Sequence, residues 1–186
     1  MRIISGTAKG LKLKTPKGLE TRPTGDRVKE SVFNILNGLV NFSEVEKVLD
    51  IFAGTGALGL ESLSRGANSA VFIDFATTDL ISENIQHGKF QNCKVLRGDF
   101  IKLLKKLSAQ NLKFDLIFSD PPYKKNLATM SIELVADLNL LADNGLMIVE
   151  YGADEILETG RLNCIRKINY GHTTNINIYQ KKGSEL

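Results

Sequence analysis

The order of hydrophobic and polar positions predicts a repeating architecture in most of this chain of 186 residues. From residue 45 onward, short apolar runs of strand type alternate with helical patterns. The expected strands cover residues 47–54, 69–75, 93–99, 114–120 and 145–152, and the helices between them cover 57–66, 77–88, 100–109 and 130–142. Strands and helices that alternate in this way form βαβ units around a parallel sheet with helices on both faces.

The carboxyl-terminal segment departs from this alternation. Residues 164–182, CIRKINYGHTTNINIYQKK, have the pattern of two strands joined by a tight turn at Gly171 and His172. Two strands joined by so short a turn must be antiparallel. The sequence therefore predicts an α/β fold whose mostly parallel, seven-stranded sheet ends in an antiparallel hairpin.

The first forty residues have a pattern of their own. Residues 2–5 and 11–15 are β-type runs separated by glycines, which predicts a small β-hairpin. The turn-like segment RPTGDR follows, and Thr24 or Asp26 is expected to cap the next helix. The apolar positions of that helix fall on one face: Val28, Val32, Ile35, Leu36 and Leu39. We expect residues 1–40 to pack as an extension on a domain of residues 41–186, in one compact unit.

Composition and charge narrow the class of protein. The chain is 42% hydrophobic and 24% charged, which is ordinary for a globular protein. It has no apolar run long enough to span a membrane, and its start lacks a signal-peptide pattern. We therefore expect a cytoplasmic protein. The spacing of the two cysteines and two histidines does not predict a metal site. Net charge is +3 overall, but residues 1–40 carry +5 and the remainder −2, which is typical of an arm that contacts a polyanion.

A glycine-rich loop follows the first strand of the repeating region. Gly54, Gly56 and Gly59 form G-x-G-x-x-G, and Asp74 ends the next strand twenty residues after Gly54. This spacing is typical of dinucleotide-binding folds. However, Asp50 at the loop end of the first strand would repel a pyrophosphate, and the chain continues into a hairpin instead of a second nucleotide-binding half.

S-adenosylmethionine fits the same residues better, because it has a ribose and an adenine but no phosphate, and it carries two positive groups. Asp50 is expected near the methionine amino end, and the backbone at Gly54 and Gly56 is expected to approach the cofactor. Asp74 would accept hydrogen bonds from the ribose. Asp99, at the end of the third strand, would accept from the adenine amino group, with Phe100 beside the ring.

The segment Asp120-Pro121-Pro122-Tyr123 closes the fourth strand, at the edge of the sheet where ligands of such folds bind. Neither proline has an N–H, so the backbone there offers carbonyl acceptors. The Asp120 carboxylate and the Pro121 carbonyl can hold an exocyclic amino group of a base and stabilise the positive charge that develops as the amine attacks a methyl group. Tyr123 offers a face on which an unpaired base stacks.

At this point the sequence resembles the bacterial 16S ribosomal RNA guanine-N2 methyltransferase family. The resemblance rests on RIISGTAKGLKL, RPTGDRVKESVFNIL, VLDIFAGTGALGLESLSRGA, FDLIFSDPPY and VEY, in family order, up to about residue 151. It implies a Rossmann-like class I methyltransferase that acts on one guanine of small-subunit rRNA, within the small ribosomal subunit or its assembly intermediate. This chain departs from the family pattern at Ala76, where an acidic residue is common, and at Gly25, where threonine or serine is usual.

RNA contact is expected from basic residues of the first forty residues and of the loop after Tyr123. The candidates are Arg2, Lys9, Lys12, Arg22, Arg27, Lys124 and Lys125. No long heptad pattern is present, so a monomer is expected.

Three alternative functions remain: a DNA or other RNA amino-methyltransferase, a small-molecule amine methyltransferase, and a non-catalytic RNA-binding factor of ribosome assembly. The 63 residues after Tyr123 leave no room for a separate DNA-recognition domain.

Overall fold

The secondary structure follows the predicted alternation of strands and helices. The computed structural model describes residues 1–16, 23–122, 126–157 and 160–183, so Arg22, Tyr123, Lys124 and Lys125 lie outside the described residues. The elements, in chain order, are α1 (Pro23–Leu36), the 3-10 helix η1 (Phe42–Glu44), β1 (Lys47–Ile51), α2 (Ala57–Arg65), β2 (Ser69–Asp74), α3 (Thr78–Gly88), β3 (Cys93–Arg97), α4 (Phe100–Ala109), β4 (Phe114–Ser119), α5 (Leu127–Asp137), β5 (Leu141–Gly152), β6 (Leu162–Tyr170) and β7 (Thr174–Lys181).

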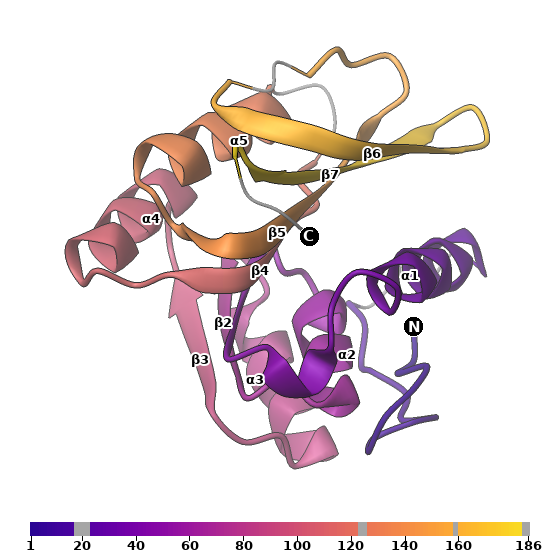
Figure 1. Ribbon diagram of the computed structural model, residues 1–186. Coiled ribbons are helices and arrows are strands. Elements are labelled where there is room, and N and C mark those ends of the chain that lie inside the picture. Colours follow the sequence, from indigo (N-terminus) through magenta and orange to yellow (C-terminus); the bar gives the residue numbers. More distant parts are fainter. Residues whose placement is uncertain (17–22, 123–125, 158–159, 184–186) are drawn as a thin grey trace.

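The seven strands form one sheet in the order β3-β2-β1-β4-β5-β7-β6 (Figure 1). The first five strands are parallel, and β7 pairs antiparallel with both β5 and β6. The predicted Rossmann-like sheet with an antiparallel carboxyl-terminal hairpin is therefore confirmed. The strand order reverses between β1 and β4, which is the place where open α/β sheets bind ligands.

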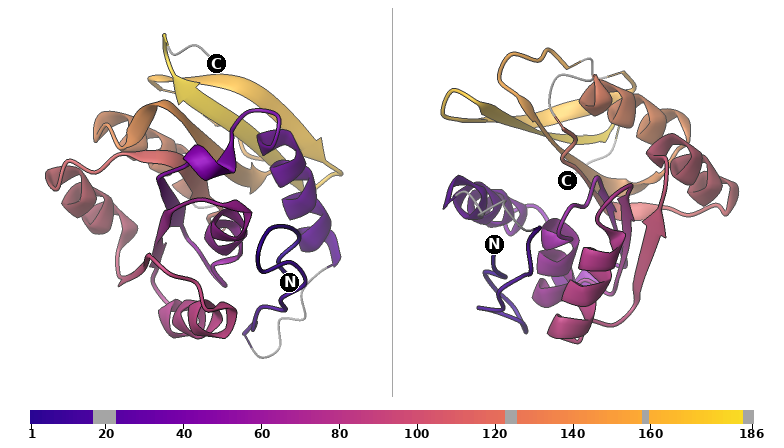
Figure 2. Two further views of the ribbon diagram at one scale, coloured as in Figure 1. Left: turned by 60° about the horizontal axis from the view of Figure 1, so that its bottom comes forward. Right: turned by 180° about the vertical axis from the view of Figure 1, so that it is seen from behind.

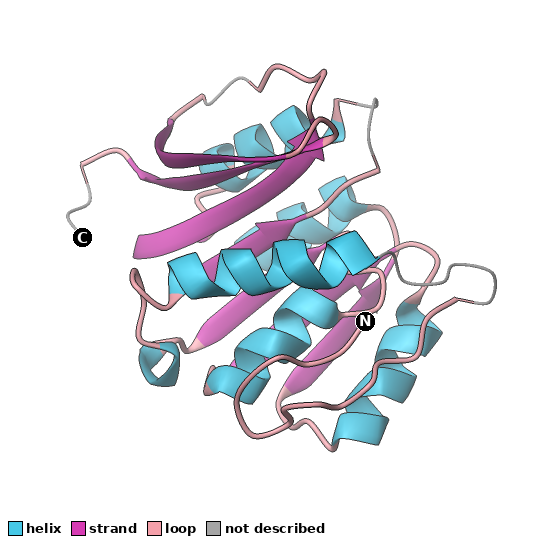
Figure 3. Ribbon diagram, turned by 90° about the vertical axis from the view of Figure 1, so that its right-hand side faces the viewer, coloured by secondary structure: helices cyan, strands magenta, loops and turns pink. Residues whose placement is uncertain are grey.

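Helices cover both faces of the sheet (Figure 2). Successive side chains of a strand point to opposite faces of the sheet. In β1, Val48 packs on the face that carries α1, α2 and α3. The next residue, Leu49, packs on the face that carries α4 and α5. Seen from the side that carries α1, that helix crosses in front of the strands (Figure 3). Among the described residues, no helix has the length and apolar character needed to cross a membrane.

Two boundary predictions were wrong. Helix α1 already begins at Pro23, so Thr24 and Asp26 lie in its first turn and neither is the residue that caps it; proline suits this position because its fixed φ is helical and its missing N–H is not needed. Helix α5 ends at Asp137, and not at residue 142, because Asn139 adopts a left-handed φ of 50° and the chain enters β5 at Leu141.

The amino-terminal segment folds back on itself and onto α2. Its two β-type runs pair antiparallel through a single bridge between Arg2 and Lys12, so the predicted hairpin is present only in this minimal form. The tip of the segment lies against the end of α2, where the Thr7 N–H donates to the Ser64 carbonyl at 2.7 Å. A Cβ at Gly6 would lie 1.7 Å from that carbonyl oxygen, so only glycine fits there.

A buried carboxylate joins this segment to α1 and α2. The Glu61 side chain, fully buried in α2, accepts hydrogen bonds from the Ile4 N–H at 2.7 Å and the Ser5 N–H at 3.0 Å. It also pairs with the Lys29 ammonium at 3.1 Å and the Arg65 guanidinium at 2.9 Å. Burial lowers the pKa of Lys29, although Glu61 opposes that shift. One acidic group thus satisfies four donors from three segments.

We predict that Glu61→Ala destabilises the protein by about 3–5 kcal/mol, because it leaves two buried cations without their shared partner. The Lys14–Glu83 pair is the matched control, since both of its side chains are about half exposed, at 55% and 53%. Glu83→Ala should change the free energy of unfolding by less than about 1 kcal/mol. Urea titration of the three proteins measures both values. Equal effects of the two substitutions would contradict the structural role given to Glu61.

Candidate active site

The loop after β1 is held in a strained conformation at the carboxyl edge of the sheet. Phe52 has a φ of 61°, which is rare for an aromatic residue, and Gly54 and Gly56 follow with φ values of 57° and 78°. The Phe52 ring packs on Phe100 with a centroid distance of 4.7 Å. Gly59 is required for a different reason, because a Cβ there would lie 2.4 Å from the Phe72 ring. The loop therefore turns sharply and keeps its backbone close to the strand ends.

Asp50 lies beneath this loop and is almost fully buried, with 1% of its surface exposed. Its Oδ2 accepts a hydrogen bond from the Gly59 N–H at 2.9 Å, which ties β1 to the start of α2. Burial raises the pKa of Asp50 from 3.8 to about 7, against the opposing effect of the Gly59 bond. Asp50 is therefore poised to change its protonation state near neutral pH.

Asp74 fixes the other side of the loop. Its Oδ2 accepts from the Gly54 N–H at 2.9 Å, and its Oδ1 accepts from the N–H groups of Ala76 and Thr77 at 2.8 and 2.9 Å. Burial raises the pKa of this carboxyl, but the three backbone donors outweigh that effect and hold the pKa below its usual value. The Ala76 departure leaves the backbone bond at that position intact.

The two residues after β3 that were predicted to bind adenine, Asp99 and Phe100, have structural roles in the described chain. The Asp99 Oδ1 caps α4 by accepting from the Lys102 N–H at 2.9 Å. Phe100 is buried, with 8% of its surface exposed, and it packs into the core beside Phe52. Phe75, directly after Asp74, is by contrast 77% exposed. An exposed aromatic ring beside the glycine loop is a candidate binding residue that the sequence pattern did not indicate.

The end of β4 brings the catalytic candidates to the same edge. The Asp120 N–H donates to the Ile51 carbonyl at 3.5 Å, so the segment starts directly beside the end of β1. Behind it, the Ser119 and Ser131 hydroxyls bond at 2.9 Å and fix the strand end to α5. Pro121 is buried and Pro122 is exposed.

A pocket of about 430 Å³ opens between these strand ends. Its lining includes Asp50, Gly54, Asp120 and Glu150, together with side chains from α1 and from the turn before β7. The walls supplied by α1 and by that turn were not predicted, and neither was the position of Glu150, from the VEY motif, in the pocket lining. Gly56, Asp74, Asp99 and Phe100 are not part of this lining in the described residues.

The pocket concentrates negative charge. Asp120 is exposed as a residue, but desolvation of its carboxyl at the pocket raises its pKa well above the usual range, and the nearby charges of Glu150 and Asp50 raise it further. The ammonium of Lys29 also lines the pocket, but it is bound to Glu61 and to the Arg2 carbonyl, the latter at 2.5 Å. Within the part of the chain that the structure describes, no group of three or more histidine, cysteine or carboxylate side chains is arranged to hold a metal ion.

The predicted RNA-binding residues in the described chain, Arg2, Lys9, Lys12 and Arg27, are all exposed. These four residues do not form one cluster, because Lys9 lies apart, beside a second cavity.

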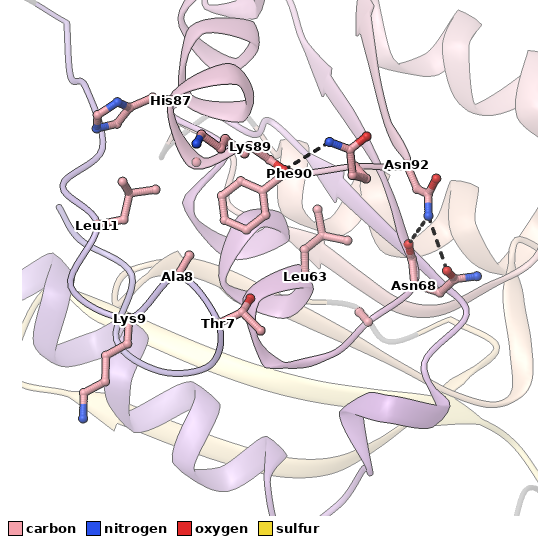
Figure 4. Close-up of a pocket in the computed structure, with 13 residues that line it drawn as sticks. Thr7, Ala8, Lys9, Leu11, Leu63, Asn68, His87, Lys89, Phe90 and Asn92 are labelled. Atoms are coloured by element: carbon pink, nitrogen blue, oxygen red, sulfur yellow. Dashed lines mark hydrogen bonds between the residues drawn. The ribbon is translucent and has the colours of Figure 1, made fainter.

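This second, open cavity of about 570 Å³ lies between the amino-terminal segment and the end of α3 (Figure 4). Asn68 and Asn92 line that cavity and immediately precede β2 and β3, so the cavity lies at the amino edge of the sheet, opposite Asp120. Two of its polar lining residues are bonded to each other, since the Asn92 side-chain amide donates to the Asn68 backbone carbonyl at 3.1 Å.

The strand order, the glycine loop after β1 and the carboxylate after β4 define a Rossmann-like fold of the class I methyltransferase type. The chain belongs to the family described as "Conserved hypothetical protein 95", whose model matches residues 1–180.

Its relatives include proteins named "Ribosomal RNA small subunit methyltransferase D". The Haemophilus influenzae protein is 39% identical over 86% of this chain and 82% of its own length, and the Escherichia coli K12 protein is 36% identical over 86% and 78%. The solved structure of the E. coli protein yhhF superposes with a TM-score of 0.83 at 34% identity, covering 100% of this chain and 99% of that one.

We predict that Asp50→Asn stabilises the protein without ligand at pH 8. The folded state holds the Asp50 proton more tightly than the unfolded chain, since its pKa is about 7 instead of 3.8. The ionised group therefore destabilises the fold above pH 7, on the order of 4 kcal/mol at most, and this penalty fades as the pH falls toward 4. Asparagine stays neutral and can still accept from Gly59.

The measurement is the free energy of unfolding of wild type and Asp50→Asn at several pH values from 4 to 8. The difference should be largest at pH 8 and shrink steadily on acidification. Exposed Asp137, replaced by asparagine, serves as a control that should show little change across this range. A difference between wild type and Asp50→Asn that does not vary with pH would contradict the assignment.

Proposed function

We propose that this protein transfers a methyl group from S-adenosylmethionine to the exocyclic N2 amino group of a guanine in 16S rRNA. The observation that carries the proposal is the position of Asp120, at the carboxyl end of β4 in the same pocket as the glycine loop. The names of the relatives support rRNA as the substrate. The resemblance in the catalytic and amino-terminal motifs supports guanine N2 as the acceptor.

The residues present fit S-adenosylmethionine, which supplies an electrophilic methyl group on a positively charged sulfur. The lysine in the described lining of this pocket, Lys29, is already paired with Glu61, so the anionic pocket suits a ligand with sulfonium and ammonium groups. Asp50 would face these cations in its ionised form, so ligand binding should favour loss of its proton. The Asp74 carboxylate has more lone pairs than its three backbone bonds use, and it is expected to accept from the ribose hydroxyls.

For the adenine, we propose Phe75 as the ring that offers a stacking face, because Phe100 is buried against Phe52. The Asp99 carboxylate uses one oxygen to cap α4 and is still expected to accept from the adenine amino group with the other. Phe100 would then support the site indirectly, by fixing the strained Phe52.

Catalysis is proposed to depend on acceptors that are already in position. The Asp120 carboxylate and the Pro121 carbonyl would each accept an N–H of the target amino group, which aims the nitrogen lone pair at the methyl carbon. The nitrogen becomes positively charged in the transition state, and Asp120 stabilises that charge. Its raised pKa makes Asp120 a suitable acceptor for the proton that the methylated amine must lose.

The partner is proposed to be the small ribosomal subunit or its assembly intermediate. Arg2, Lys12 and Arg27 are exposed on the segment and helix that lie beside the pocket wall, so they are the described residues best suited to contact phosphates near the target base. Lys9, at the opposite edge of the sheet, would have to contact a more distant part of the RNA.

The test of the proposed function is methyl transfer from labelled S-adenosylmethionine to unmethylated small subunits. Asp120→Asn should lower the rate about 100-fold or more, because an amide cannot stabilise the developing cation equally well. Its affinity for S-adenosylmethionine should stay within a few-fold of wild type, as measured by calorimetry. Asp137→Asn, an exposed aspartate on α5, is the matched control and should leave the rate unchanged. Near-normal transfer by Asp120→Asn would contradict the mechanism.

A second prediction separates the adenine site from general surface effects. Phe75 and Ile156 are exposed large hydrophobic residues, at 77% and 92%. Phe75→Ala should weaken S-adenosylmethionine binding about tenfold, because base stacking on an aromatic ring contributes about 1–3 kcal/mol. Ile156→Ala should leave the dissociation constant unchanged. Equal constants for both variants and wild type would exclude Phe75 from the adenine site.

A further inference from the structure

Glu150 lies beside the proposed catalytic aspartate on the neighbouring strand. β4 and β5 are parallel, and their last paired residues are Ser119 and Val149, so Asp120 and Glu150 follow at the same level. Adjacent strands are about 4.8 Å apart. Both side chains line the pocket of about 430 Å³, and Glu150 is half-buried there.

The alternation of side chains places these groups on one face. Phe118 and Ile148, two residues before Asp120 and Glu150, belong to the core beneath α1, α2 and α3, whereas Val149 belongs to the opposite core. Glu150 therefore projects toward the same side of the sheet as Asp120. The charge of Glu150 is close enough to contribute to the raised pKa of Asp120.

Two acceptors side by side match the donor pattern of guanine. Its Watson–Crick edge presents the N1–H next to the N2 amino group, so two neighbouring donors face outward. Adenine and 2-aminopurine instead present a lone pair at N1, which a carboxylate repels. Enzymes that act on an extruded base commonly read this edge by hydrogen bonds.

We propose that Glu150 accepts the N1–H of the target guanine while Asp120 holds its N2 amino group, so that Glu150 selects guanine among bases that carry an amino group. This assignment rests on the proposed function and names the base-recognition residue of that same site. Asp50 is less suited to the task, because it is fully buried and bonded to Gly59 beneath the cofactor loop.

The test compares guanine with 2-aminopurine at the target position of small subunits assembled from ligated rRNA. Both bases carry the N2 amino group, but only guanine has an N1–H. Wild type should prefer guanine by about 100-fold or more in kcat/KM, since a site built to bind an N–H rejects an analogue that lacks it. Glu150→Gln should reduce this preference at least about tenfold, because its amide can donate to the N1 of 2-aminopurine.

Two controls separate specificity from structure. Glu133→Gln, an exposed glutamate on α5, should keep the wild-type preference. Asp120→Asn should lower the rate on both bases to a similar extent and keep their ratio near that of wild type. An effect of Glu150→Gln that is equal on both bases, or no effect, overturns the assignment but leaves the proposed function standing. Methyl transfer by wild type to an atom other than guanine N2 overturns both.

Discussion

Parallel pairing of β1, β4 and β5 is the constraint on which the site depends, because it brings the carboxyl ends of these strands to one edge of the sheet. Asp50, Asp120 and Glu150 come from these three strands and line one pocket. Burial raises the pKa of both Asp50 and Asp120, and the charges of Glu150 and Asp50 raise the pKa of Asp120 further, so ionised groups repel each other at this edge of the sheet. A positively charged cofactor and a base that donates hydrogen bonds would relieve that repulsion, so the same groups that destabilise the fold favour the proposed ligands.

The amino-terminal segment and α1 contribute to the site as walls, and not only as a surface for RNA. Val28, Val32 and Lys29 of α1 line the pocket, and Lys29 is anchored by the buried Glu61. Asn84 of α3 adds another link, since its side-chain amide donates to the carbonyls of Lys14 and Thr55, at 3.1 and 3.0 Å. The segment proposed to contact RNA is therefore bonded to the loop proposed to bind the cofactor.

Much of this arrangement could be predicted from the sequence, because it follows from local patterns. Asp50, Asp74 and Asp120 each lie at or next to the carboxyl end of an apolar strand. The carboxyl ends of parallel strands meet at one edge of the sheet, so the common edge of these residues was predictable. The terminal hairpin was predictable from its tight turn at Gly171, which has a φ of 63°.

The rest depended on packing that local patterns do not encode. Lys29 is one of the basic residues behind the +5 charge of residues 1–40, although it lies on the buried side of α1 and is only 3% exposed. Phe75 follows Asp74, which ends β2, and Phe100 follows Asp99, which caps α4. Only the tertiary structure separates the exposed ring from the buried one. Glu150 stood in the motif VEY, but its role as a pocket residue required the register between β4 and β5.

The identity of the methylated atom tests the central claim most directly. Unmethylated small subunits would be incubated with the wild-type protein and S-adenosylmethionine, and the rRNA would then be digested to nucleosides for mass spectrometry. The account predicts N2-methylguanosine from the 16S rRNA, at one nucleotide per subunit. A methyl group on adenine, on another atom of guanine, or on no nucleoside at all would contradict it.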